Sequence, residues 1–238
     1  PPSAAAETRI GPASGCWQLP GAGSRFRAMR DPFLTAFHDL AVAEGAGHPE
    51  MESPMALLAD SLTRVVPAAE LPRVTLPVVD EHLETTLAAG VGPAADLARM
   101  VASRTGWAVP YPEYAGEPDM DAMRLGYAYS PIIGAAEDAI SGSTATPVYL
   151  SDEVFAGMVL QGPGVTYPPH VHKAVEVYWV LAGSADWQKG DAWSTHGPGT
   201  VILHDTGVRH ATVTCDEPQL LFFAWVTDPD CVPVIIRL

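Results

Sequence analysis

The chain has 238 residues, enough to bury an ordinary hydrophobic core as one elaborated domain or two small ones. It has 28 acidic and 13 basic residues, a formal net charge of -15, and no Lys/Arg-rich segment to neutralise phosphates. Nucleic acid is therefore not an expected partner. Because no apolar run approaches the roughly 20 residues that cross a bilayer, we expect no membrane span.

The cysteines bear on the compartment. Cys16, Cys215 and Cys231 are odd in number and have no C-x-x-C spacing. This pattern argues against a disulfide scaffold and against a zinc ribbon. The opening residues also lack the charged and apolar regions of a secretory signal. We therefore expect a cytoplasmic protein.

The first half of the chain is predicted to be helical. Helical patterns and boundary signals occur in four segments, 31–45, 53–66, 79–90 and 92–106. The first segment has an Asp-Pro start signal at Asp31, and the second has Ser53 as its expected N-cap before a proline. Together the four segments predict a small helical layer.

Beyond about residue 110 the pattern changes to short, β-branched segments with turns about every ten residues. The predicted strands lie within 146–150, 154–160, 175–183, 199–205, 210–215, 219–227 and 231–238. This spacing is typical of a small antiparallel barrel or jelly roll. We predict a mainly β fold, with a helical region over residues 1–125 and a β-barrel over residues 126–238, packed as one compact unit.

Residues 164–183 contain several groups that can bind a metal. On a strand, residues i and i+2 point to the same face, so His170 and His172 share one face, as do Glu176 and Tyr178. Two imidazoles and a carboxylate brought together across a hairpin suit a divalent transition ion, Fe, Mn, Ni, Co or Zn, and leave coordination positions open. The alternative interpretation is an H-x-H pair that decorates the surface of an edge strand.

The pattern around these residues resembles that of the cupin superfamily. The first cupin signature, G-x5-H-x-H-x3-E-x6-G, is matched without a gap by Gly164, His170, His172, Glu176 and Gly183. The second is matched by Gly199, Gly207 and His210, whereas Asp205 replaces its proline and Thr214 its asparagine. The resemblance implies a cupin double-stranded β-helix, or jelly-roll barrel, with one metal ion held by His170, His172, Glu176 and His210.

Three aromatic residues accompany the expected ligands. Tyr178 follows Glu176 by two residues, and its phenol, with a pKa near 10 in water, would become a general base beside a divalent cation. Tyr167 precedes Glu176 by nine residues, and Trp225 follows His210 by fifteen. With these spacings the chain resembles the cupin-type dimethylsulfoniopropionate lyases of marine bacteria.

This second resemblance implies a β-elimination that yields acrylate and dimethyl sulfide. The metal would bind the substrate carboxylate, and Tyr178 would take the proton from the adjacent carbon. Tyr167 and Trp225 would hold the sulfonium by cation–π attraction. Trp179 alternates with Tyr178 and should face away from the metal. The expected partner is a small zwitterion, and a homodimer is a further expectation.

Three other functions could use the same barrel. An Fe(II) dioxygenase of a small thiol or acid, or a sugar or keto-acid isomerase, would share the ligand set, and an anaerobic assay separates the dioxygenase from the lyase. A non-enzymatic cupin would bind a ligand without forming product. Among the remaining histidines, His196 falls in a Pro/Gly loop and His204 precedes a turn. We expect structural positions for both, with substrate contact as the alternative.

Overall fold

The computed structural model describes residues 31–69, 73–135 and 145–237. Cys16 and the opening segment considered for a secretory signal lie outside the described residues. Helices precede the barrel, in the order α2 (Pro32–Gly47), α3 (Glu52–Leu62), α4 (Pro77–Ala89), α5 (Gly92–Val101) and α6 (Pro118–Gly126). Short 3-10 turns occur at Pro49–Met51 and Pro112–Tyr114.

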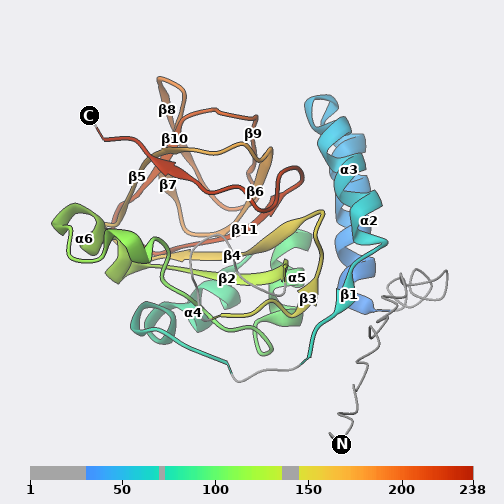
Figure 1. The fold of residues 1–238 in the computed structure, drawn as a ribbon, viewed down its shortest axis with the longest axis horizontal. Coiled ribbons are helices and arrows are strands. Elements are labelled where there is room, and N and C mark those ends of the chain that lie inside the picture. Colours follow the sequence, from blue (N-terminus) through green and yellow to red (C-terminus); the bar gives the residue numbers. More distant parts are fainter. Residues whose placement is uncertain (1–30, 70–72, 136–144, 238) are drawn as a thin grey trace, which may run out of the picture.

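The strands form two sheets that face each other (Figure 1). The seven-stranded sheet contains, in spatial order, β1 (Val66–Pro67), β3 (Tyr149–Leu150), β2 (Tyr127–Gly134), β4 (Phe155–Gln161), β11 (Gln219–Trp225), β6 (Glu176–Ala182) and β9 (Val201–His204). The five-stranded sheet contains β12 (Val234–Ile235), β5 (Thr166–Val171), β10 (His210–Thr214), β7 (Ala185–Lys189) and β8 (Ala192–His196). The predicted mainly β fold with N-terminal helices is confirmed.

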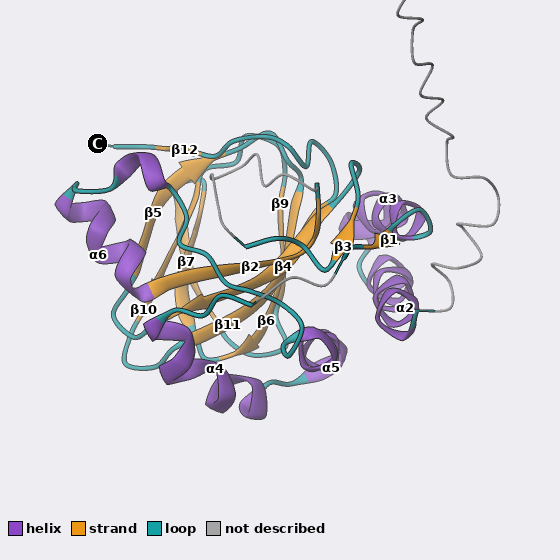
Figure 2. Ribbon diagram, turned by 60° about the horizontal axis from the view of Figure 1, so that its bottom comes forward, coloured by secondary structure: helices purple, strands orange, loops and turns teal. Residues whose placement is uncertain are grey.

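The seven-stranded sheet is buried on both faces. Helices α4 and α5 lie against its outer face, and α2 and α3 pack beside them (Figure 2). On β6, Val177, Trp179 and Leu181 join the core shared with the helices, whereas Tyr178 and Val180 join the core inside the barrel. This alternation follows from the two-residue period of a strand. The expectation that Trp179 faces away from Tyr178 agrees with this packing.

The two predicted helix starts have different outcomes. Asp31 is the N-cap of α2, where its side chain accepts hydrogen bonds from the backbone N–H groups of Phe33 and Leu34. Ser53 is not a cap, because α3 begins at Glu52 and Met51 occupies the N-cap position without a side-chain hydrogen bond. The 3-10 turn before α3 leads directly into the helix, which places Ser53 inside the first turn.

Four strands, β1, β2, β7 and β8, were not predicted from the sequence. Strand β2 is buried along its whole length, but it contains Pro131, next to which its pairing with β4 changes register. Proline is tolerated in sheets at such irregularities. Strands β7 and β8 form an antiparallel pair, so His196 ends a strand and does not lie in a loop.

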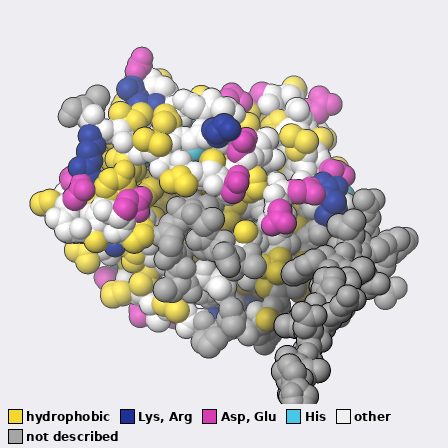
Figure 3. All heavy atoms as spheres, in the orientation of Figure 1, with side chains coloured by type: hydrophobic (Ala, Val, Ile, Leu, Met, Phe, Trp, Pro, Cys, Tyr) yellow, Lys and Arg dark blue, Asp and Glu magenta, His cyan; other side chains and the backbone are white. Residues whose placement is uncertain are grey.

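The surface has no concentrated charge on the face drawn in Figure 3, where acidic and basic side chains are interspersed. Within the described parts of the chain, every helix is too short or too polar to traverse a bilayer.

Candidate metal centre

The structure brings the four expected ligands together inside the barrel. His170 and His210 are directly paired between β5 and β10, and their ring centroids lie 4.0 Å apart. Glu176 is the first residue of β6 in the facing sheet, and His172 lies just after β5. The Glu176 Oε2 atom lies 2.9 Å from His172 Nε2 and 3.3 Å from His210 Nε2. All four side chains are buried.

Backbone carbonyls fix the orientation of the three imidazoles. The Nδ1 atoms of His170, His172 and His210 lie 2.9, 3.0 and 2.9 Å from the carbonyl oxygens of Pro168, Ala174 and Val208, respectively. A carbonyl oxygen only accepts, so each Nδ1 must carry the proton. Each Nε2 then has a lone pair, the arrangement typical of metal-binding histidines.

The electrostatics of this cluster fit a cation. The lone pair of His172 Nε2 faces Glu176 Oε2, and the buried Nε2 of His210 has no hydrogen-bond partner among the described residues. Burial alone would raise the pKa of Glu176, but in the metal-free protein protons on the Nε2 atoms of His172 and His210 would hold it well below its usual range. Lone pairs and a carboxylate at such distances repel unless a proton or metal ion lies among them. The donor set of imidazoles and a carboxylate suits a transition metal ion.

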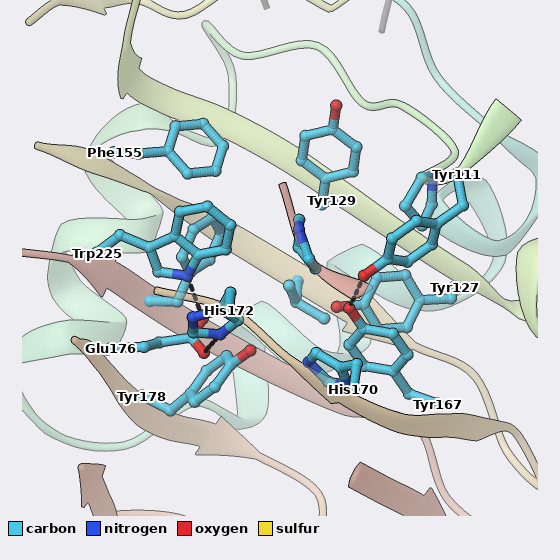
Figure 4. Close-up of a pocket in the computed structure, with 14 residues that line it drawn as sticks. Tyr111, Tyr127, Tyr129, Phe155, Tyr167, His170, His172, Glu176, Tyr178 and Trp225 are labelled. Carbon is cyan, nitrogen blue, oxygen red and sulfur yellow. Dashed lines mark hydrogen bonds and ion pairs between the residues drawn. The ribbon is translucent and has the colours of Figure 1, made fainter. Parts of the chain in front are cut away.

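Trp225 contacts the expected ligands directly. Its indole Nε1–H donates a hydrogen bond of 2.7 Å to Glu176 Oε1, and its ring lies 4.7 Å from that of His172 (Figure 4). The β11–β6 register places Trp225 opposite Glu176. The sequence predicted a role in substrate binding only, whereas the structure gives Trp225 a second contact, with the carboxylate of the expected ligand Glu176.

An aromatic pocket opens onto the cluster (Figure 4). Tyr178, Tyr167 and Trp225 line it, as do His170, His172 and Glu176. Its other lining residues are Pro110, Tyr111, Tyr127, Tyr129, Phe155, Val159, Phe223 and Pro233. The pocket therefore combines polar metal-binding groups with aromatic walls, as a site for a small cation-containing molecule would.

Tyr111 was not singled out from the sequence, and it comes from the helical half of the chain. Its hydroxyl is hydrogen-bonded to that of Tyr167, and its backbone has φ 56° and ψ 58°, the left-handed region. A bulky residue rarely adopts this conformation unless its surroundings impose it. The segment before α6 thus contributes to the pocket wall.

Burial governs the acidity of the pocket tyrosines. It raises the pKa of Tyr178 well above 10, and the negative charge of Glu176 raises it further. Burial likewise raises the pKa of Tyr167 well above its ordinary value. A phenolate at Tyr178 therefore requires positive charge beside it, which the adjacent ligand cluster is suited to bind.

His204 is a further buried histidine, which the sequence placed before a turn without indicating that it lies beside the cluster. It is the last residue of β9, is 1% exposed and lies directly opposite Glu176 across the β6–β9 pair. Its ring centroid is 4.1 Å from that of His210, and burial lowers its pKa to about 3. His204 follows Ile202 by two residues on the same strand, and Ile202 belongs to the core inside the barrel. The two-residue period of a strand could therefore have predicted that the His204 side chain also faces the barrel interior.

The comparisons with known proteins first define the class. The chain superposes on the crystal structure of the dimethylsulfoniopropionate lyase DddQ from Ruegeria pomeroyi DSS-3 with a TM-score of 0.63 and 26% sequence identity, over 86% of this chain and 96% of that one. The fold of the chain is thus a cupin-type barrel with N-terminal helices. The sequence model of the dimethylsulfoniopropionate lyase family matches residues 52–221, and the chain belongs to that family.

Two curated relatives agree with this assignment. The chain is 36% identical to the lyase DddQ of Ruegeria pomeroyi over 88 residues, which are 37% of this chain and 44% of that protein. It is 34% identical to DddL of Cereibacter sphaeroides over 126 residues, which are 52% of this chain and 47% of that protein. The chain spans about half the length of the curated relatives it matches.

Proposed function

We propose that the protein is a metal-dependent carbon–sulfur lyase that cleaves dimethylsulfoniopropionate to acrylate and dimethyl sulfide. The observation that carries the proposal is the position of Tyr178, which shares an aromatic pocket with Glu176, His170 and His172. A base, a cation-binding cluster and aromatic walls are the three features that this elimination needs. Membership of the dimethylsulfoniopropionate lyase family supports the choice of substrate.

We assign His170, His172, Glu176 and His210 as ligands of one divalent transition ion, for which Zn, Fe, Mn, Ni and Co are the candidates. An ion bound there supplies Lewis-acid stabilisation of the substrate carboxylate as negative charge develops next to it. The buried surroundings strengthen every such electrostatic interaction by excluding water. An ion held by these residues would also keep the carboxylate end of the substrate beside Tyr178.

Tyr178 performs the proton transfer. As phenolate it removes a proton from the carbon next to the substrate carboxylate, and that C–H electron pair becomes the new C=C bond. The C–S bond breaks at the same time or directly afterwards, and its electrons leave with sulfur. A neutral dimethyl sulfide, an acrylate ion and a neutral Tyr178 result, so atoms and charge balance.

The aromatic walls hold the sulfonium end. Tyr167 and Trp225 line the pocket, and each cation–π contact would contribute about 0.5–2 kcal/mol. These contacts weaken when the sulfonium becomes neutral dimethyl sulfide, which favours product release. Tyr127 and Phe155 extend the same aromatic lining.

An anaerobic turnover assay tests the proposal. Protein is stripped with a chelator, reloaded with each candidate ion and supplied with dimethylsulfoniopropionate in the absence of dioxygen. We expect dimethyl sulfide in the headspace and acrylate in solution in a 1:1 ratio, and none from the stripped protein. Absence of both products with every ion would contradict the lyase. Substrate binding without product would indicate the non-enzymatic alternative.

The assembly and the compartment are separate parts of the proposal. We propose a homodimer, which light scattering coupled to size-exclusion chromatography tests by its mass. We also propose a cytoplasmic location, which cell fractionation tests.

A further inference from the structure

We propose that His204 is an additional metal ligand, which forms an inner triad with Glu176 and His210 in a centre whose predicted ligands are His170, His172, Glu176 and His210. This inference rests on the proposed metal centre. It assigns a ligand that neither cupin signature contains.

The geometry of the inner triad is that of a metal site. Ligand atoms of Glu176, His204 and His210 all lie within 4.8 Å of one another, as do those of His170, His172 and His210. His210 belongs to both groups. Small side-chain movements would bring the inner atoms to the roughly 2.0–2.2 Å from a central ion that nitrogen and oxygen ligands adopt.

The position of His204 follows from strand register. Glu176 is paired with Trp225 on one side and with His204 on the other. Side chains directly opposite each other on neighbouring strands share a face. The β9 strand thus directs His204 to the side of the sheet on which Glu176 lies.

The hydrogen bonding of His204 sets it apart from an ordinary packed histidine. Neither ring nitrogen has a hydrogen-bond partner among the described residues, although the side chain is fully enclosed. A buried polar group without a partner costs about 1–3 kcal/mol. Packing against the rings of His210, Tyr178 and Trp187 would be served equally well by an apolar side chain. Coordination of a metal gives one nitrogen a partner.

His204 differs from the three predicted histidine ligands in its hydrogen bonding. No backbone carbonyl fixes its tautomer, in contrast to the other three imidazoles. Like His210, it is not among the described residues that line the aromatic pocket. It therefore lies outside the pocket lining, as a ligand whose ring is held by packing and not by a hydrogen bond.

Metal titration of variants tests the assignment. His204→Gln removes the imidazole and His204→Phe keeps an aromatic ring, while His196→Gln is the matched control for a barrel histidine outside the cluster. Stripped proteins are titrated with Co(II), monitored by visible absorption, and with Zn(II) in competition with a chromophoric chelator. We expect both His204 variants to lose at least about 10-fold in affinity and to change the Co(II) spectrum, with the control unchanged.

Unchanged affinity and spectrum in both variants would overturn the inference and leave the predicted centre intact. A lower affinity with an unchanged spectrum would also overturn it, because His204 would then act from outside the coordination shell. A wild-type protein that binds neither ion would overturn both the inference and the proposed centre.

A measurement on the wild-type protein tests the same assignment without relying on the variants to fold. Protein labelled with 15N-histidine and loaded with 113Cd should show coupling between cadmium and a ring nitrogen of His204. Coupling confined to His170, His172 and His210 would refute the assignment.

Discussion

The hydrogen bond from Trp225 to Glu176 offers a sharp test of how the centre is held. Trp225→Phe keeps an aromatic ring in the pocket but removes the indole N–H that lies 2.7 Å from Glu176 Oε1. A hydrogen bond to a charged acceptor contributes about 1.5–3 kcal/mol, and its loss leaves a buried carboxylate oxygen without this donor. At about 1.4 kcal/mol per factor of ten, metal affinity should fall on the order of 10- to 100-fold.

The assay is chelator competition for Zn(II) with purified Trp225→Phe protein. Trp193→Phe is the matched control, because Trp193 is 51% exposed on β8 and outside the pocket. Thermal unfolding with and without metal separates lost affinity from lost folding, since weaker binding shrinks the metal-induced rise in Tm. Wild-type metal affinity combined with a raised KM would refute the reasoning and leave Trp225 with a substrate role alone.

Three further predictions concern the base, the fold and pH. Tyr178→Phe should retain metal and lose at least about 100-fold in turnover, and near-normal turnover would exclude Tyr178 as the base. Gly183→Ala should destabilise the fold much more than Gly207→Ala in urea unfolding. Both glycines have positive φ, which costs an alanine about 1–2 kcal/mol, but a Cβ at Gly183 would lie 1.9 Å from the carbonyl oxygen of Pro218, whereas none at Gly207 meets an atom within 4 Å. Equal losses would contradict this. Finally, the metal-stripped protein should lose stability as pH falls from 6.5 towards 3, because the unfolded chain protonates His204 while the folded chain, with a pKa of about 3, does not. The expected slope is about 1.4 kcal/mol per pH unit for this group, and His204→Gln should flatten it; an unchanged slope would show that His204 is solvated.

The strands of the barrel could be predicted from the sequence wherever a local residue pattern indicates the local structure. Strands such as β6 and β11 have β-branched and aromatic residues between turn signals, and they were predicted within a few residues. Strand β2 was missed because Pro131 and its aromatic neighbours suggest an irregular segment. Its burial depends on pairing with β4, which is close to it in space but separated by the intervening chain.

The candidate site likewise contains some residues that local spacing predicts and others that only the assembled fold brings together. His170 and His172 are brought together by adjacent spacing, so a two-residue period predicts their common face. Tyr111 reaches the pocket from a segment more than fifty residues before Tyr167, and no local pattern indicates that meeting. His204 meets Glu176 only through the register of β6 and β9, which is a property of the assembled sheet.

Because the seven-stranded sheet is buried on both faces, the barrel cannot be separated from its helices without exposing apolar surface. Trp179 packs against Phe37 of α2 and donates a hydrogen bond to Glu44, while its chain neighbour Tyr178 lines the pocket. A barrel produced without its helices would expose Val177, Trp179 and Leu181 of β6 to water. Such an exposed apolar patch favours aggregation. Substitutions where α2 packs on β6, as at Phe37 and Trp179, would shift that strand. They would thereby change how Tyr178 and Glu176 are aligned, although they lie on the other face of the sheet from the pocket.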